Sequence, residues 1–249
     1  IAVASTEPQL EVPPAWGSQA GIEQALAAGD ETLPASVVYA WAAIAEGCAY
    51  VNFTPSTGAT PAGVRAYAEA RGVPVAGNDG KTGETLLRTT LAPMFRARNL
   101  DVRSWSGFNI LGNRDGEVLD EPAANAAKTG GKDKVLGAIL GPGLGSSLTR
   151  IDYVPSLRDW KTAWDYVHFA GFLGTKMSLQ FTWQGADSAL AAPLVLDLAR
   201  LLELAARRGQ GGVQAGLACF FKAPLGSDEH DFARQMQAFA DYAGGPLRG

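Results

Sequence analysis

The stretch "AYVNFTPSTGATPAGVRAYAEARGVPVAG", residues 49–77, carries the pattern that decides the fold. Its first segment, "AYVNF", combines β-branched and aromatic residues, which is typical of a strand, and "VPVAG" is a second short apolar segment. Between them, "TPAGVRAYAEARG" predicts a helix that ends at Gly72. The short links indicate that the two strands pair in parallel and that helices cover the faces of the sheet.

The residues before this stretch continue the alternation. "IAVAS", residues 1–5, is strand-like, and "LPASVVYAWAAIAEGC" predicts an Ala-rich helix with Pro34 near its start and Gly47 near its end. Residues 1–79 therefore predict an α/β fold that resembles the second half of a dinucleotide-binding domain. Because the chain opens on Ile1 inside a strand-like segment, we expect that an N-terminal part of the natural protein precedes it.

Composition limits the class of protein. The chain has 249 residues, of which 47% are hydrophobic and 18% charged, enough apolar material for one large core or two linked ones. A net charge of −4 argues against nucleic-acid binding, and no apolar run is long enough to span a membrane. Cys48 and Cys219 lie far apart, and His168 and His230 form no cluster. We therefore predict reduced thiols, a cytoplasmic location and no metal site.

Beyond residue 80 the expected elements change in character. We predict helices at residues 85–98, 160–174 ("WKTAWDYVHFAGFLG") and 190–208, and strands within "DVRSWSGFNILGNRDG", "VLGAIL", "TRIDYVP" and "KMSLQFTWQG". The segment "GLACFFKAPLG" predicts a short strand or turn. Residues 117–134 hold too little apolar content to pack alone, so we expect them to be mobile until a ligand orders them.

The turn "AGNDGKTGETLL", residues 76–87, permits two interpretations. It is an ordinary surface turn in which Thr82 or Thr85 caps the following helix. Alternatively it is an anion site, because backbone N–H groups at a helix start bind phosphate and hydroxyl groups add hydrogen bonds. A second Gly-rich stretch, "GPGLGSS" at 141–147, departs from the dinucleotide fingerprint and predicts a loop.

Four lysines stand in unusual positions. Lys128 and Lys132 flank "TGG", Lys161 lies in "RDWKTAWD", and Lys222 lies between "FF" and "APL". Positive charges beside strand ends in an acidic protein indicate a small anionic ligand. The neighbours of Lys222 should hold its ammonium near apolar surface, which lowers the pKa of a lysine and allows it to act as an acid.

Five motifs in order resemble those of the myo-inositol-1-phosphate synthase family. They are "GNDGKTGETLL", "FNILGNRDG", "RDWKTAWD", "ADSALAAPLVLDLARLLELAAR" and "FFKAPL", and "VASTEP" and "AIAEGCAYVNFTPS" fit the family's cofactor domain. The resemblance implies an NAD-dependent isomerase that converts glucose 6-phosphate to myo-inositol 1-phosphate. Oxidation at C5 makes a C6 proton acidic, the enolate attacks C1, and reduction at C5 completes a redox-neutral reaction.

The resemblance also assigns roles to positions in this chain. The implied catalytic residues are Lys128, Lys132, Lys161, Lys222, Asp115 and Asp159, and the implied phosphate-binding residues are Thr82, Gly83, Glu84 and Thr85. The implied NAD-binding residues are Val3, Ala4, Ser5, Thr6, Thr54, Asp79, Asn113, Asp187 and Ser188. The chemistry requires lysines that converge on one pocket, because positive groups must face oxygens that become negative.

The resemblance further implies a partial Rossmann-like NAD-binding domain at residues 1–79, an inserted α/β catalytic and oligomerisation domain at 80–194, and a return to the first domain at 195–249. The family's inserted sheet makes oligomer contacts, so a homotetramer or homodimer is implied. The family's nucleotide-binding glycine loop precedes the point at which this chain begins.

Several positions depart from the family pattern. Glu84 stands where the family usually has Gln, and a carboxylate there repels phosphate unless Lys81 or another lysine offsets it. Asn78, Arg114 and Arg158 are further departures. They leave two alternatives open: a related carbocycle-forming enzyme that acts on another sugar phosphate, or a relative without catalytic activity.

Overall fold

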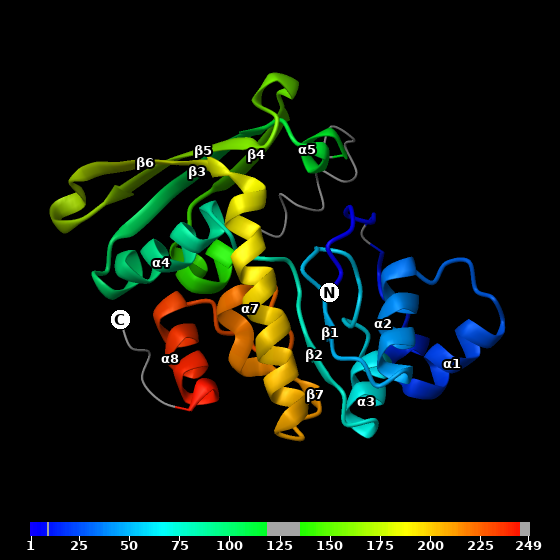
Figure 1. The fold of residues 1–249 in the computed structure, drawn as a ribbon. Coiled ribbons are helices and arrows are strands. Elements are labelled where there is room, and N and C mark those ends of the chain that lie inside the picture. Colours follow the sequence, from blue (N-terminus) through cyan, green and yellow to red (C-terminus); the bar gives the residue numbers. More distant parts are fainter. Residues whose placement is uncertain (9, 119–134, 245–249) are drawn as a thin grey trace. The chain divides into compact units, whose positions relative to one another are not determined.

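Two short parallel strands, β1 (Tyr50–Val51) and β2 (Pro74–Ala76), flank helix α3 (Ala62–Ala70), as the opening stretch predicts. The computed structural model describes residues 1–8, 10–118 and 135–244. Its described part forms two compact units (Figure 1): unit 1 spans 1–80, 193–228 and 239–244, and unit 2 spans 81–118, 135–192 and 229–238. Residues 229–238 thus belong to unit 2, although the sequence analysis placed all of 195–249 with the first domain.

Unit 1 is built on a parallel sheet in the order β1-β2-β7, with β7 at Gly212–Val213. Tyr50 and Val75 pack in one apolar core with residues of α1 (Gln19–Ala27), α2 (Ala35–Ala45) and α3. Val51 and Ala76 face a second core with Leu198 of α7 (Asp187–Arg207). Because neighbouring residues of each strand point to opposite faces, this sheet is covered on both faces, as in Rossmann-like folds. The α/β prediction is confirmed.

Unit 2 contains a four-stranded mixed sheet in the order β4-β3-β5-β6. The strands are β3 (Asp101–Leu111), β4 (Ser147–Tyr153), β5 (Trp160–Ala170) and β6 (Lys176–Ala186). Only the β3–β4 pair is parallel. Helix α4 (Glu84–Ala97) and the helical residues 135–140 pack on one face, where Phe95, Trp105 and Leu136 are fully buried.

Two elements of unit 2 contradict the sequence analysis. Residues 160–174 were predicted to be a helix, but β5 occupies 160–170 because Ala163, Asp165 and Val167 alternate on the buried face. "VLGAIL" was predicted to be a strand, but residues 135–140 are helical, and Val135, Leu136 and Ile139 form the buried stripe of a helix. A six-residue apolar run does not distinguish the two structures by itself.

The remaining elements complete the two units. The described helices also include α5 (Arg114–Val118), α7 (Asp187–Arg207) and α8 (Phe232–Ala243), with 3₁₀ segments η1 (Pro14–Gly17), η2 (Gly141–Gly143), η3 (Pro155–Leu157), η4 (Phe172–Gly174) and η5 (Ala215–Phe220). The predicted strand at residues 1–5 is reduced to one bridge between Ala2 and Asn52. Within the described chain, no helix combines the length and apolarity that a membrane crossing requires.

Candidate functional site

The turn before α4 contains backbone N–H groups that the N-cap residue does not cap. Gly83 is the N-cap residue, so the interpretation of Thr82 or Thr85 as the cap is wrong. Gly83 has no side chain that could accept a hydrogen bond from the first turn of the helix. The first N–H groups of a helix have no partner within it, and they bind an anion when no side chain satisfies them.

Two polar side-chain atoms at this turn lack a hydrogen-bond partner within the described chain. They are the hydroxyl oxygen of Thr85 and the indole nitrogen of Trp183, and both are buried. Trp183 lies against Gly83, since a Cβ placed on that glycine would lie 3.1 Å from the indole nitrogen. Buried polar groups without partners are rare, so both atoms are suited to a polar ligand. Sequence reasoning missed Trp183, which lies on β6, far from this turn in the sequence.

Among the described residues, Arg88 offsets the charge of Glu84. Its carboxylate pairs with Arg88 at 2.7 Å, and both side chains are almost fully buried. Lys81 instead binds the side-chain oxygen of Gln235 and lies over the ring of Phe232, 5.2 Å from its centroid. The Glu84 side chain thus points into unit 2 rather than lying free beside the turn, and Arg88 is a second residue that sequence reasoning missed.

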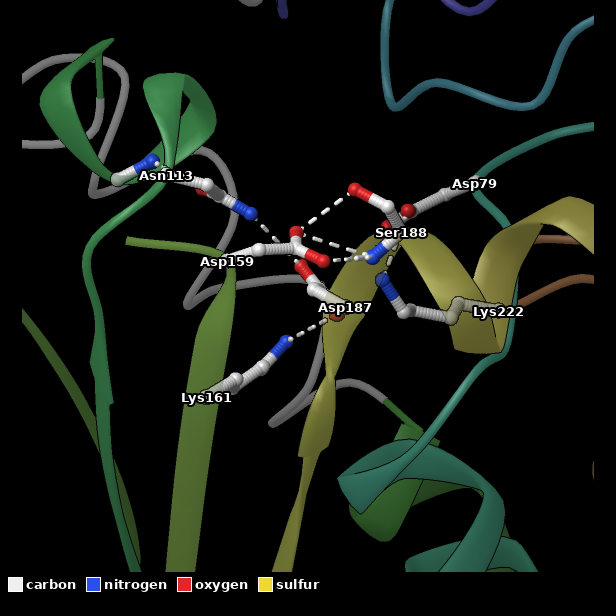
Figure 2. Close-up of polar contacts among 8 residues, drawn as sticks. Asp79, Asn113, Asp159, Lys161, Asp187, Ser188 and Lys222 are labelled. Atoms are coloured by element: carbon white, nitrogen blue, oxygen red, sulfur yellow. Dashed lines mark hydrogen bonds and ion pairs between the residues drawn. The ribbon is translucent and has the colours of Figure 1, made fainter. Parts of the chain in front are cut away.

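Five of the predicted residues meet in unit 2, where three loops come together (Figure 2). They are Asn113 after β3, Asp159 and Lys161 at the start of β5, and Asp187 and Ser188 at the start of α7. Lys161 Nζ lies 3.5 Å from Asp187 Oδ1, and Asn113 donates to Asp187 Oδ2 at 3.3 Å. Asp159 accepts bonds from the backbone N–H and the hydroxyl of Ser188, the latter at 2.7 Å.

The other residues predicted for this region are placed as follows. Asp115 lies in the first turn of α5, and Arg114 beside it is exposed. Arg158 is also exposed and has a left-handed backbone with φ 52°. Lys128, Lys132 and most of the segment 117–134 lie outside the described residues. Lys161 belongs to unit 2 and Lys222 to unit 1, so the convergence of the lysines stays a prediction.

Unit 1 holds a second group of polar residues, next to the end of β2. Lys222 Nζ lies 2.8 Å from Asp79 Oδ1, and the two side chains are 14% and 17% exposed. Backbone bonds join the same segments: the N–H of Lys222 donates to the carbonyl of Asp79, and Asn78 and Ala223 exchange bonds. Figure 2 includes the Asp79–Lys222 contact.

Thr54 is held by a buried asparagine network that the sequence did not reveal. Asn52 Oδ1 accepts bonds from the backbone N–H and the hydroxyl of Thr54, and Asn52 Nδ2 donates to Asn78 Oδ1 at 3.0 Å. The amide of Asn78 in turn donates to Thr60 Oγ1 at 2.7 Å. Buried side-chain amides that satisfy one another in this way fix the loops after β1 and β2.

The predicted cofactor residues of unit 1 follow parallel strand segments at one edge of its sheet. Val3, Ala4 and Ser5 follow the Ala2 bridge and are exposed, while Thr6 is buried. Thr54 follows β1, and Asp79 follows β2. In open α/β sheets, ligands bind outside the carboxyl ends of the strands. These residues present hydroxyl groups, a carboxylate and exposed backbone. Such groups are chemically suited to hydrogen-bond a dinucleotide. Among the described residues no group of metal-ligating side chains occurs.

Comparison with known families identifies related proteins. A family model described as myo-inositol-1-phosphate synthase matches residues 83–188. Inositol-3-phosphate synthase 1 of Bacteroides thetaiotaomicron is 38% identical over 242 residues, which cover 94% of this chain and 56% of that protein. Inositol-3-phosphate synthase of Trypanosoma brucei brucei is 35% identical over 190 residues, covering 72% of this chain and 36% of that protein. The chain thus spans about half the length, or less, of these relatives.

Solved structures give the same picture of the fold. Inositol-3-phosphate synthase from Caenorhabditis elegans superimposes with a TM-score of 0.88 at 27% identity, covering 98% of this chain and 53% of that one. A myo-inositol-1-phosphate synthase-related protein from Thermotoga maritima gives a TM-score of 0.84 at 24% identity, covering 99% of this chain and 66% of that one.

Proposed function

Because the chain belongs to the myo-inositol-1-phosphate synthase family, we propose that it is part of an NAD-dependent cyclase that converts glucose 6-phosphate to myo-inositol 1-phosphate. The relatives are named as inositol-3-phosphate synthases, which are isomerases. The chain covers only part of their length, so the activity, the substrate and the partners of the whole protein are our proposal.

The observation that supports a sugar phosphate best is the turn before α4. A phosphate placed there receives bonds from backbone N–H groups that the N-cap residue Gly83 cannot cap, and from the Thr85 hydroxyl and the Trp183 indole N–H, which otherwise lack partners in the described chain. The partial positive charge at the N-terminus of the fourteen-residue helix α4 adds to the attraction for an anion. We assign Thr82, Gly83, Glu84 and Thr85 to this site, with Glu84 acting through its backbone.

In unit 1, we assign Val3, Ala4, Ser5, Thr6, Thr54 and Asp79 to NAD, and in unit 2 Asn113, Asp187 and Ser188. When bound, NAD would supply the hydride acceptor and donor that the reaction requires. The Asp79 carboxylate accepts a hydrogen bond and the Lys222 ammonium donates one, so together they can hold the proton that leaves a substrate hydroxyl. Their partial burial strengthens both interactions, because water screens them less.

Lys161 and Asp187 form the corresponding pair in unit 2. We propose that the Lys161 ammonium stabilises a substrate oxygen that becomes negative during enolisation or C–C bond formation, while Asn113 and Asp187 fix the position of that ammonium. Asp159 orders the start of α7 through Ser188. We assign the remaining proton transfers to Lys128, Lys132 and Asp115 by resemblance.

The outer face of the unit 2 sheet supports an oligomeric enzyme, a homotetramer or a homodimer. Phe108, Ile110, Leu148 and Trp164 are each more than a third exposed there, and Phe108 packs beside Trp164 with ring centroids 5.6 Å apart. Contiguous exposed aromatic and aliphatic side chains of this kind mark protein–protein interfaces.

A second candidate is a related cyclase for another sugar phosphate. The exposed cations Arg114 and Arg158 favour it, because each adjoins a proposed site residue, Asn113 or Asp159. A substrate with additional negative charge would benefit from them.

One experiment separates these possibilities. The natural full-length protein that contains these residues is incubated with NAD and, separately, with each member of a panel of hexose and pentose phosphates, and phosphorus NMR follows the products. We expect glucose 6-phosphate to give an inositol phosphate without accumulation of NADH. Binding of NAD with glucose 6-phosphate unchanged and another sugar consumed would establish the second candidate. Absence of NAD binding would favour a relative without catalytic activity.

A further inference from the structure

A buried charged cluster lies within unit 2 and contacts the first turn of α4. We define the Glu84 cluster as Glu84, Arg88 and Asp165, whose side chains are at most 2% exposed. Arg88 Nη2 lies 2.7 Å from Glu84 Oε1 and 3.0 Å from Asp165 Oδ1, and Arg88 Nε donates to the same Asp165 oxygen at 3.1 Å. One guanidinium therefore serves two carboxylates.

Residues of the sheet bind this cluster and leave room for it. Trp105 of β3 donates its indole N–H to Asp165 Oδ1 at 2.7 Å, and Arg88 donates to Thr149 of β4 at 3.0 Å. Gly107 lies directly beneath, because a Cβ there would lie 2.0 Å from Arg88 Nη2 and 2.4 Å from Glu84 Oε1. A glycine in the middle of a strand provides room for a close approach of this kind.

The cluster connects the proposed phosphate turn to the sheet. Glu84 is the first residue of α4 and follows Gly83 directly, and Arg88 lies one turn later. The other end of the connection is Asp165 on β5. A buried ion cluster stabilises a fold little more than well-packed apolar residues would. We therefore infer that the main effect of these ions is on the geometry of the turn. That geometry fixes the direction of the N–H groups at the start of α4.

The charge balance of the cluster has a consequence for anions. With both carboxylates ionised the net charge is −1, which opposes an anion at the adjoining turn. Burial, and then the charge of Glu84, raise the pKa of Asp165 to about 6. Within the described chain, Asp165 accepts hydrogen bonds from Arg88 of α4 and Trp105 of β3. The charged groups that act on its carboxyl there are Arg88 and Glu84, both on α4.

We propose that Arg88 and Asp165 are positioning residues for the anion turn, and that binding of an anion there is coupled to uptake of one proton by the Glu84 cluster. This inference rests on the proposed function, since it takes the turn at 82–85 to be the phosphate site. An anion is attracted more strongly once the cluster is neutral, and linkage requires that a bound anion in turn strengthens the binding of the proton.

Calorimetry with sulfate tests the coupling, because sulfate keeps its charge between about pH 5 and pH 8 whereas a phosphate monoester titrates with a pKa of about 6. Binding to the full-length protein is measured in two buffers with different heats of ionisation, which gives the number of protons taken up. We expect proton uptake by the wild type near pH 6, and an affinity that rises about three- to tenfold as the pH falls across this range.

Asp165→Asn should bind sulfate at pH 8 about as tightly as the wild type does at pH 5, and without proton uptake. Glu84→Gln keeps the shape of the side chain and should also reduce the number of protons taken up on sulfate binding. This variant therefore tests the coupling even if Asp165→Asn fails to fold. Asp101→Asn removes an exposed acid of the same unit and is the control.

Equal proton uptake by the wild type, Asp101→Asn and both cluster variants would overturn the inference alone. If the wild-type protein binds neither sulfate nor glucose 6-phosphate, the proposed function is overturned together with it.

Discussion

Lys222 and Asp79 are joined twice, once by an ion pair of 2.8 Å between their side chains and once by a backbone hydrogen bond of 2.7 Å. Their separation in sequence is large, but the antiparallel bridge between Gly80 and Phe221 brings the two segments together. The ammonium is therefore held in a defined position beside the end of β2. This arrangement is suited to an acid–base pair, because neither group has to be ordered when substrate binds.

Substitution of Lys222 should abolish turnover without unfolding the protein. We expect Lys222→Ala to lower kcat by at least about 100-fold, the usual contribution of a positioned acid or base. The effect should fall on kcat, because Lys222 is proposed to transfer a proton rather than to bind the phosphate. Steady-state kinetics with circular dichroism measure this, and Lys176→Ala, at an exposed lysine of β6, is the control. A Lys222→Ala enzyme with wild-type kcat would remove Lys222 from the mechanism.

Trp183→Phe should separate binding from stability. The indole N–H has no partner within the described chain, so its removal should leave the free energy of unfolding unchanged or raise it by up to about 1 kcal/mol. The KM for the sugar phosphate should rise about fivefold, since one hydrogen bond to phosphate is lost. Urea titration and kinetics measure the two effects. Trp160→Phe, at an exposed residue of β5, should change neither. An unchanged KM in Trp183→Phe would exclude the indole from the phosphate site.

Gly107→Ala should destabilise unit 2 strongly. The added methyl group would collide with Arg88 and Glu84, so the buried ion pairs must separate or shift, at a cost of about 3 kcal/mol or more. Gly137→Ala is a matched control, because no atom lies within 4 Å of a Cβ at that helical position. This control should stabilise the protein by about 0.5–1 kcal/mol, the usual gain for Ala over Gly in a helix. Similar urea midpoints for the two variants would contradict the close packing at Gly107.

Asp165 should make the stability of the fold depend on pH. Its pKa is raised from 3.8 to about 6, so the native state binds a proton more tightly than the unfolded state does. The free energy of unfolding contributed by this group is therefore fully present below about pH 4 and is lost as the pH rises through about 6. The loss is on the order of 3 kcal/mol. Urea unfolding of the wild type and Asp165→Asn at several pH values measures the difference, which should disappear if Asp165 titrates normally.

The parts of the fold that follow local rules could be predicted from the sequence. Helix α3 and its flanking strands, and the long helix α7, show the expected periodicities and end signals. Strand β5 could not be recognised, because Asp165 occupies a central buried position and interrupts the apolar alternation between Ala163 and Val167. Its partner, Arg88, is 77 residues earlier in the chain, and no local pattern connects the two.

In the candidate site, too, some residues could be predicted from the sequence and others could not. Resemblance assigned Asp159 and Lys161 to catalysis and Asn113, Asp187 and Ser188 to the cofactor. The structure brings these five residues together, and their roles stay predictions. Trp183 could not be predicted, since its alternation with Leu179 and Phe181 in β6 indicates an ordinary core residue. The orientation of Glu84 depends on the room above Gly107, which only the paired strands create.

The fate of a single deuterium tests the proposed ring closure most directly. Glucose 6-phosphate deuterated at C5 is incubated with NAD and the natural full-length protein that contains this chain, and the product is analysed by NMR and mass spectrometry. Our account predicts an inositol phosphate that retains the deuterium, with no net NADH, because the hydride removed from C5 is returned to the same carbon. A product that has lost the deuterium, or unchanged sugar phosphate in the presence of bound NAD, would contradict it.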